Sequence, residues 1–245
     1  MKAKLEGRNV VLEALSRGRR VFEIKIDKGA KGDKIDEILQ KAKAGKVGVT
    51  LVDRRRLDAI TSTDAHQGVI AMAEALHTEK LSAVLERTPS PFMVVLREVY
   101  DKGNLGAIMR SGAAAGLDAL IVSPTKKGPF SAQAERVSMG ASNAVPVISL
   151  GVFDAISLLR KAGVKIVGVE VSGNLDYFAT DLTGSVAFIF GGEDRGLSLP
   201  IREKCDIVVR VPMKGGVQSL NLSATAAVLM FEKVRQVAML PARRN

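Results

Sequence analysis

Hydrophobic and polar positions divide the chain into two α/β segments, the first over residues 5–74. Here helical and strand patterns alternate in the order helix, strand, helix, strand, helix, strand. The helical spacing falls on Val10, Val11, Ala14 and Leu15 and again on Ile35, Ile38, Leu39 and Ala42, and the strand patterns cover 21–26, 47–51 and 68–73. A pattern of about 70 residues is long enough for a small domain, so we expect one over residues 1–74.

Residues 75–90 carry charges and only weak apolar spacing, and prolines follow at Pro89 and Pro91. We interpret them as a linker. Beyond it, near-continuous apolar runs alternate with helical patterns, which is typical of a parallel sheet covered on both faces. The second domain is expected over 91–245, with strands at 92–96, 119–122, 164–171, 186–190 and 207–211 and helices at 104–115, 131–142, 152–162 and 221–237.

Charge adds a candidate partner. The chain of 245 residues has 36 Lys and Arg against 26 Asp and Glu, a formal net charge of +10. Residues 1–80 hold 17 basic and 12 acidic residues, so the shorter segment is the denser in charge. A basic balance favours a polyanion such as nucleic acid, with a generic basic surface as the alternative.

Residue types also exclude several chemistries. One cysteine and two histidines cannot form a disulfide or a Cys/His zinc site, and no metal is expected. The N-terminus lacks the apolar core of a signal peptide, and no apolar run reaches membrane-spanning length, so we expect a cytoplasmic protein without membrane contact. Neither G-x-G-x-x-G nor G-x-x-x-x-G-K-[ST] occurs, which argues against a dinucleotide-binding Rossmann enzyme and a P-loop NTPase.

Three glycine-rich polar segments follow predicted strands of the second domain. Ligands of open α/β sheets bind beyond the carboxyl ends of strands, so a site is expected there. In 101–112, Asn104 is a candidate N-cap and Arg110 is either a phosphate ligand or a solvated helix arginine. The second segment, 190–197, offers glycine backbone and Glu193 to a ligand, although a tight turn is the simpler reading.

The third segment, 211–223, leads into the last helix, which Asn221 can cap. That helix carries an apolar stripe that we expect to be core or a dimer interface. The stripe consists of Ala224, Ala227, Val228 and Phe231.

Taken together, the three segments resemble the SpoU (TrmH-like) family of S-adenosylmethionine-dependent RNA ribose 2′-O-methyltransferases. N-L-G-A-I-M-R is similar to its first motif, F-G-G-E-D-R-G-L to its second and V-P-M-K-G-G-V-Q-S-L-N-L-S-A-T to its third, in matching order over about 90–240. E-G-R-N-V-V-L-E-A-L and H-Q-G-V, near the N-terminus, resemble the substrate-binding domain of the RlmB-like branch. That branch modifies a guanosine of large-subunit (23S) ribosomal RNA.

The resemblance implies an α/β fold whose parallel sheet carries a deep trefoil knot, preceded by a small α/β domain of ribosomal-protein-like fold. It also implies S-adenosylmethionine as cofactor, ribosomal RNA as partner and a homodimer formed through the C-terminal domain. By motif position, the catalytic residues would be Asn104, Arg110, Glu193, Ser219 and Asn221, the cofactor contacts Gly191, Gly192, Val211, Pro212, Met213 and Leu220, and the RNA contacts Arg8, Asn9 and Arg136.

Within that set, Arg110 is expected to contact the phosphate next to the target ribose and to assist deprotonation of the 2′-hydroxyl, with Glu193 as a less favoured base. Arg136 could equally be a helix-surface arginine. Two positions depart from the family pattern: Gly112 replaces an alanine, and Asn9 stands where relatives often carry histidine. A tRNA 2′-O-methyltransferase, an antibiotic-resistance methyltransferase and a non-catalytic RNA-binding or ribosome-assembly protein remain as alternatives.

Overall fold

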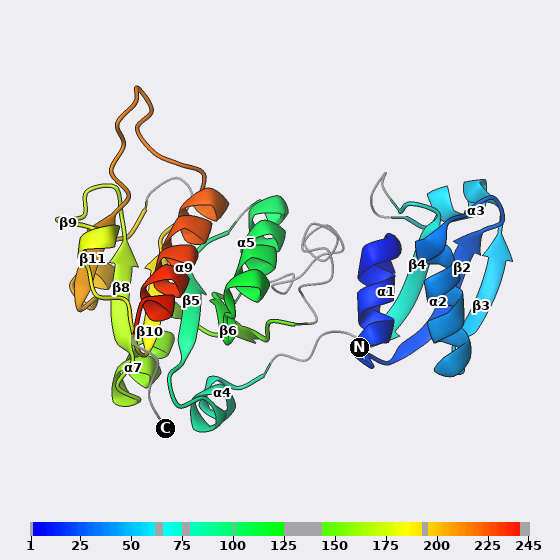
Figure 1. Ribbon diagram of the computed structural model, residues 1–245, viewed down its shortest axis with the longest axis horizontal. Helices are drawn as coiled ribbons and strands as arrows, with labels where there is room; N and C mark the ends of the chain where they lie inside the picture. Colours follow the sequence, from blue (N-terminus) through cyan, green and yellow to red (C-terminus); the bar gives the residue numbers. More distant parts are fainter. Residues whose placement is uncertain are drawn as a thin grey trace. The chain divides into compact units, whose positions relative to one another are not determined.

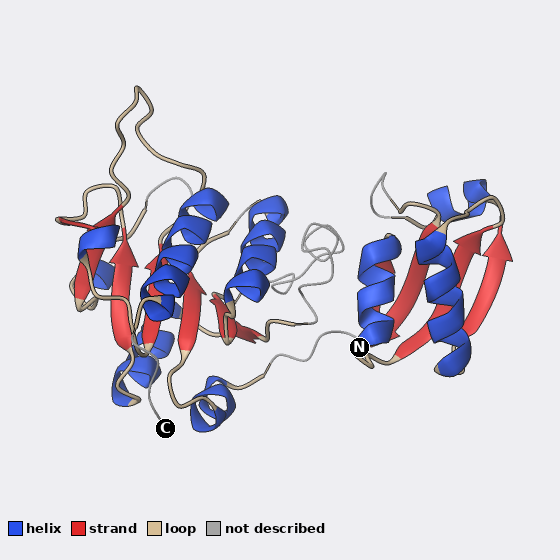
Figure 2. Ribbon diagram, viewed as in Figure 1, coloured by secondary structure: helices blue, strands red, loops and turns tan. Residues whose placement is uncertain are grey.

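The computed structural model describes residues 2–61, 66–74, 79–99, 101–124, 144–192 and 196–240. Within them the chain forms two compact units, each built on its own sheet (Figures 1 and 2). Both units combine helices and strands, which confirms the predicted α/β class. No helix in these ranges is both long enough and apolar enough to cross a membrane.

The smaller unit has a four-stranded sheet in the order β1-β4-β2-β3. Its strands are β1 (Lys2–Glu6), β2 (Val21–Asp27), β3 (Gly48–Val52) and β4 (Val69–Glu74). Strand β4 pairs antiparallel with β1 and β2, whereas β2 and β3 are parallel. Strand β1 was not predicted from the sequence, because alternating lysines leave only its last two residues buried.

Three helices accompany this sheet: α1 (Arg8–Ser16), α2 (Asp33–Ala44) and α3 (Arg54–Asp58). Most residues that carried the helical spacing lie in one core with the inner faces of β2 and β4. Leu39 is the exception, since 38% of it is exposed. The predicted alternation of helix and strand over this segment is therefore confirmed.

The larger unit has a seven-stranded sheet, β7-β6-β5-β10-β8-β11-β9, in which every pairing is parallel. Its strands are β5 (Phe92–Leu96), β6 (Ala119–Val122), β7 (Val147–Ser149), β8 (Lys165–Val169), β9 (Leu175–Asp176), β10 (Val186–Phe190) and β11 (Ile207–Arg210). All residues of the central strands β5 and β10 are buried, as a sheet covered on both faces requires. The edge strands β7 and β9 were not predicted, because runs of two or three residues carry too little pattern.

The remaining helical elements are α4 (Leu81–Arg87), α5 (Lys102–Ala115), α7 (Val152–Lys161), η2 (Tyr177–Ala179), α8 (Leu199–Arg202) and α9 (Leu222–Ala238). Helix α4 occupies part of the segment interpreted as a linker, and its Leu81 and Val84 lie in the core of the larger unit. The expected helix at 131–142 falls outside the described residues. The implied trefoil knot stays a prediction.

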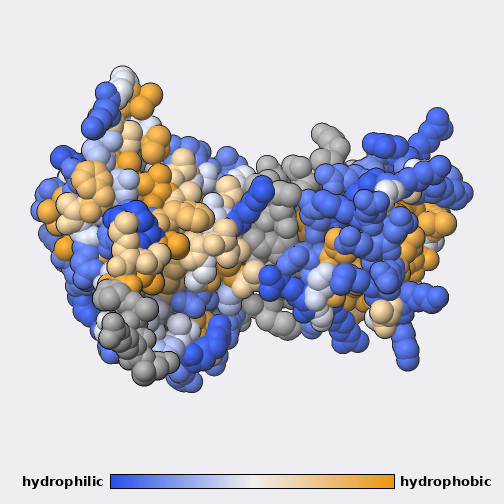
Figure 3. Space-filling model, viewed as in Figure 1, coloured by the Kyte–Doolittle hydropathy of each residue, from blue (hydrophilic) through white to orange (hydrophobic). Residues whose placement is uncertain are grey.

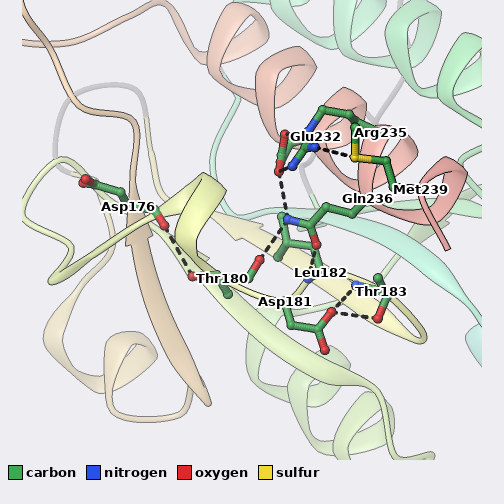
Figure 4. Close-up of polar contacts among 9 residues, drawn as sticks. All are labelled: Asp176, Thr180, Asp181, Leu182, Thr183, Glu232, Arg235, Gln236 and Met239. Atoms are coloured by element: carbon green, nitrogen blue, oxygen red, sulfur yellow. Dashed lines mark hydrogen bonds and ion pairs between the residues drawn. The ribbon is translucent and has the colours of Figure 1, made fainter.

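The C-terminal helix α9 is fixed by polar contacts to the chain that precedes β10 (Figure 4). The Gln236 amide nitrogen donates to the Thr180 carbonyl at 2.9 Å, and its amide oxygen accepts from the Leu182 backbone N–H at 2.7 Å. The buried Lys233 ammonium donates to the Gly184 carbonyl at 2.6 Å. These bonds satisfy backbone groups that lie outside the strands, and they hold the second half of α9 against this segment.

Candidate active site

A cavity of about 670 Å³ lies beside the carboxyl ends of four neighbouring strands, β5, β10, β8 and β11. The arrowheads of β5, β8 and β10 point to this edge of the sheet in Figure 2. The first turns of α5 and α9 complete the wall. The cavity is lined by Asp101, Asn104, Val169, Glu170, Val171, Phe190, Gly191, Gly192, Gly196, Val211, Met213, Ser219, Leu220, Asn221, Leu222 and Thr225.

The three motif segments therefore converge on one cavity, although they lie up to about 120 residues apart in sequence. Arg110 lies about two turns further along α5, where it is exposed and outside the lining, and Pro212 sits between two lining residues. Glu193 and Arg136 lie outside the described residues. The predicted positions that do line the cavity are Asn104, Gly191, Gly192, Val211, Met213, Ser219, Leu220 and Asn221.

A side-chain hydrogen bond joins the first and third motifs. The Asn221 amide nitrogen donates to the Asn104 amide oxygen at 3.0 Å. Asn104 was expected to cap the helix it begins, and this is wrong: α5 starts two residues earlier, and the Asp101 carboxylate caps it by accepting from the Gly103 N–H at 2.7 Å. Asn104 thus sits in the first turn, 92% buried, where its amide is available to α9 rather than to its own backbone.

Asn221 caps α9, as predicted, because its amide oxygen accepts from the Ser223 backbone N–H at 2.8 Å. The same side chain thus ends the third motif segment, begins the helix and binds Asn104. The core-facing residues of α9 are not those of the expected stripe: Ala226, Leu229 and Met230 are buried, whereas Phe231 is 46% exposed. The prediction that the stripe belongs to the core is therefore wrong, whereas the alternative of a dimer interface stays a prediction.

Gly191 and Gly192, before the undescribed residues 193–195, pack backbone directly on backbone against Gly196, after them. The Gly196 N–H donates to the Gly192 carbonyl at 3.0 Å, and the two residues form an isolated bridge. A methyl group on Gly191 would overlap the carbonyl group of Gly196. Glycine is therefore required at Gly191 for the turn to close, and the turn brings bare backbone to the cavity wall.

Glu170 lines the cavity and was missed by the sequence analysis. Its carboxylate accepts from the Leu197 backbone N–H at 2.6 Å and from the Val171 N–H at 3.0 Å. It thereby ties the end of β8 to the turn that follows β10. The only signal in the sequence was one acidic residue at the end of an apolar strand. This pattern does not distinguish a site residue from an ordinary solvent-exposed strand end.

The charge of the lining indicates what the cavity can hold. Among its described residues, Asp101 and Glu170 are charged, both are acidic, and no lysine or arginine lines the wall. Such a wall disfavours a phosphate-bearing ligand and favours a cationic one. Apolar side chains from Val169, Phe190 and Leu220 supply the opposing surface that a flat ring needs. S-adenosylmethionine, with a sulfonium, an ammonium and an adenine ring, fits this combination and a cavity of this size.

A second pocket, of about 480 Å³, lies in the smaller unit. Two of the predicted RNA contacts, Arg8 and Asn9, line it. Among the described residues no group of three or more histidine, cysteine, aspartate or glutamate side chains is placed to hold a metal ion.

Comparison with known proteins points to one family. Residues 91–231 match the SpoU rRNA Methylase family, and residues 4–79 match the RNA 2′-O ribose methyltransferase substrate binding family. The chain is 34% identical to the 23S rRNA (guanosine-2′-O-)-methyltransferase RlmB of Vibrio vulnificus, over 89% of this chain and 90% of that protein.

Solved structures agree. The SpoU methyltransferase AviRb from Streptomyces viridochromogenes, in complex with the cofactor AdoMet, superposes with a TM-score of 0.83 at 25% identity, covering 97% of this chain and 91% of that one. An AdoMet-bound rRNA methyltransferase from Sinorhizobium meliloti gives 0.80 at 28% identity, covering 98% and 88%. With its motifs gathered around one cavity and a family match over more than half its length, this chain belongs to the SpoU rRNA methylase family.

Proposed function

We propose that this protein transfers a methyl group from S-adenosylmethionine to the ribose 2′-oxygen of a guanosine in 23S ribosomal RNA. The observation that carries the proposal is the convergence of all three motif segments on one cavity, whose charged lining residues within the described ranges are acidic. The RlmB relatives support the choice of substrate, since they align over about nine-tenths of both chains.

When bound, S-adenosylmethionine supplies an already activated methyl group on its sulfonium. The protein therefore has to align donor and acceptor, and alignment alone can lower a barrier by up to about 7–11 kcal/mol. The Asn104–Asn221 bond and the two bonds of Glu170 hold the first turns of α5 and α9 and the turn after β10 in fixed positions around the cavity. Gly191 and Gly192 let a ligand approach the backbone closely.

Arg110 is proposed to bind the phosphate beside the target ribose and to stabilise the 2′-oxygen as it loses its proton. Its exposed position on α5, away from the acidic lining, suits a residue that meets the RNA rather than the cofactor. Ser219 and Glu193 are proposed to orient the RNA or the neighbouring loops, and Arg136 to contact RNA. Pro212 is proposed to shape the loop between Val211 and Met213.

Residues 1–74 are proposed to bind the RNA and 91–245 to catalyse the transfer; 75–90 joins them, and its helix α4 packs into the core of the larger unit. We further propose that the protein is a cytoplasmic homodimer that associates through the larger unit. Figure 3 shows hydrophobic side chains exposed on that unit. On α9 and just after it the exposed apolar residues are Phe231, Val234, Val237, Met239 and Leu240. Exposed apolar side chains that cluster in this way are typical of a protein–protein interface.

The proposal is tested by incubating the purified protein with labelled S-adenosylmethionine and separate 23S rRNA, 16S rRNA and tRNA pools, then mapping the methylated nucleotide. Label on the 2′-oxygen of a 23S guanosine is the expected result. Label confined to tRNA would keep the chemistry and overturn the substrate. No transfer to free RNA or to ribosomal precursor particles, together with no cofactor binding, would favour a non-catalytic RNA-binding protein.

Arg110 is tested by two variants in the same assay. Arg110→Ala should abolish transfer and leave cofactor binding unchanged. Arg110→Lys keeps the charge but loses the planar fork that binds phosphate through two parallel bonds, so most activity should still be lost. Full activity of Arg110→Ala would refute the role given to this residue.

A further inference from the structure

The pocket in the smaller unit combines cations with small residues that expose backbone. It is lined by Arg8, Asn9, Asp27, Gly29, Ala30, Lys34, Arg54, Gln67 and Gly68. Three of these side chains are cationic and one is acidic, and the Asp27 carboxylate already accepts from the Gly29 backbone N–H at 3.2 Å. No aromatic residue is among them, so stacking on a base is not what this pocket provides.

In both amide side chains of the pocket, the oxygen accepts a hydrogen bond from within the protein. The Gln67 amide oxygen accepts from the Arg8 backbone N–H at 3.2 Å, and the Asn9 amide oxygen accepts from the Lys34 ammonium at 2.6 Å. An N–H or an ammonium only donates, so in each amide the atom facing it must be oxygen. Both amides therefore have their NH2 groups left to present to a ligand.

Arg8 holds this arrangement in place. Its Nε donates to the Gln67 carbonyl at 3.0 Å, and its Nη1 donates to the Lys31 carbonyl at 2.9 Å. The guanidinium thus links the backbone of Gln67, which lines the pocket, to that of Lys31, which follows the lining residue Ala30 in the chain. Arg8 was proposed above to contact RNA. Its two hydrogen bonds indicate that it also positions the backbone of Gln67 and Lys31.

The backbone at Gln67 is also strained. Its φ of +54° lies in the left-handed region, which residues other than glycine rarely adopt. The buried His66 supports it, because Nδ1 accepts from the Gly68 N–H at 3.0 Å while Nε2 bonds to the Asp58 carboxylate at 2.8 Å. Strain held by several bonds is common at binding sites, and here it falls on a residue that lines the pocket.

We propose that this pocket binds one phosphodiester group of the RNA substrate, with the NH2 groups of Asn9 and Gln67 donating to its oxygens and Lys34 and Arg54 supplying charge. Phosphate oxygens only accept hydrogen bonds, and the two amides, whose oxygens are already bonded within the protein, have NH2 groups that can donate them. Figure 3 shows mostly hydrophilic side chains on the visible face of the unit that carries α1 and α2. The inference rests on the proposed function for the identity of the polyanion as RNA.

Two near-isosteric variants test it in the full-length protein. Asn9→Asp and Gln67→Glu each keep the oxygen that accepts the internal bond and replace the outward NH2 by a carboxylate oxygen. Gln40→Glu is the matched control, because Gln40 is exposed on α2 more than a turn beyond Lys34 and makes the same change of charge outside the pocket. The probe is a 23S rRNA transcript, with binding measured over a series of salt concentrations.

Each pocket variant should bind the transcript about tenfold to a hundredfold more weakly, whereas Gln40→Glu should stay within about twofold of wild type. Loss of one phosphate contact should also reduce the slope of log affinity against log salt by about 0.7–0.9. Thermal stability and S-adenosylmethionine affinity should not change. Weakening by all three variants alike would overturn the inference and leave only a general charge effect.

Two further outcomes separate this inference from the proposed function. If wild type methylates 23S rRNA and both pocket variants bind the transcript normally, the pocket assignment fails and the function stands. If wild type transfers no methyl group but the pocket variants still lose RNA binding, the function fails and the pocket stands. Binding of inorganic phosphate that the variants abolish, without any loss of RNA binding, would identify a site for a free anion and overturn the assignment to RNA.

Discussion

Two adjacent glycines in the wall of the candidate active site should respond very differently to the same substitution. In Gly191→Ala the new methyl group would overlap the carbonyl of Gly196 and press on the Leu197 backbone nitrogen. Carbon atoms in contact normally lie about 3.5–4.0 Å apart, so the turn between Gly191 and Gly196 would have to open. In Gly192→Ala the methyl group would instead lie 2.8 Å from the Glu98 carboxylate oxygen.

The magnitude follows from what has to move. Glu98 is a partly exposed side chain, which can rotate away at little cost, so Gly192→Ala should change the free energy of unfolding by no more than about 0.5 kcal/mol. Overpacking against fixed backbone costs about 1–3 kcal/mol. Gly191→Ala should therefore lower the melting temperature by about 2–4 °C for each kcal/mol of stability that it loses. Since the turn lines the cavity, Gly191→Ala should also weaken S-adenosylmethionine binding at least tenfold, or about 1.4 kcal/mol.

Isothermal titration with S-adenosylmethionine and thermal unfolding of both variants beside wild type test this reasoning. Gly192→Ala serves as the matched control, because it adds the same methyl group one residue away. Equal cofactor affinity and equal melting temperature for Gly191→Ala would refute the close backbone packing. Equal losses in both variants would show that any added methyl group disturbs this wall.

Three other residues give separate tests. Glu170→Gln leaves either the Leu197 or the Val171 backbone N–H without an acceptor, so S-adenosylmethionine should bind about tenfold more weakly. Glu203→Gln, at an exposed position, is the control and should bind the cofactor normally. Equal cofactor affinity of the two variants would exclude a positioning role for Glu170. Asn221→Ala should be about 1 kcal/mol less stable than Asn221→Ser, because serine also caps helices and both variants lose the amide that donates to Asn104; identical melting curves for the two would contradict the cap. Burial raises the pKa of the Cys205 thiol to about 11, so the folded protein holds this proton more tightly than the unfolded chain and should lose stability as pH rises from about 9 to 11. Cys205→Ala should remove that part of the pH dependence, and an unchanged profile would show that other groups cause it.

Local pattern determined much of the fold. The limits of β5, β6 and β10 agree with the apolar runs that predicted them, and Asn221 caps α9 as its residue type indicates. These features depend on neighbours in sequence: apolar continuity for a buried strand, and a side-chain oxygen within reach of the next turn for a cap. The strands β1, β7 and β9 were not predicted, because they are short or lysine-rich and form through pairing with β4, β6 and β11, respectively.

The site was predicted only in part. Motif residues such as Asn104, Gly191 and Leu220 could be identified because the family resemblance places them, and the cavity contains them. Glu170 could not, since nothing in its sequence surroundings shows that it will bind the backbone of Leu197, 27 residues further on. Arg110 was expected to contact the phosphate beside the target ribose; it lies about two turns along α5, exposed and outside the cavity lining, and that contact stays a proposal.

By itself, then, the sequence determined the α/β class, the central strands, the cap of α9 and, through its motifs, the family. Only the tertiary structure decided that α5 and α9 meet through the Asn104–Asn221 bond, that the charged residues described in the cavity wall are acidic, and that Asn9 and Gln67 line one pocket with their amide oxygens bonded inside the protein. The physical reason is the range of the interactions. Strand pattern and capping act over a few residues, whereas each of these features joins side chains from segments that only folding brings together.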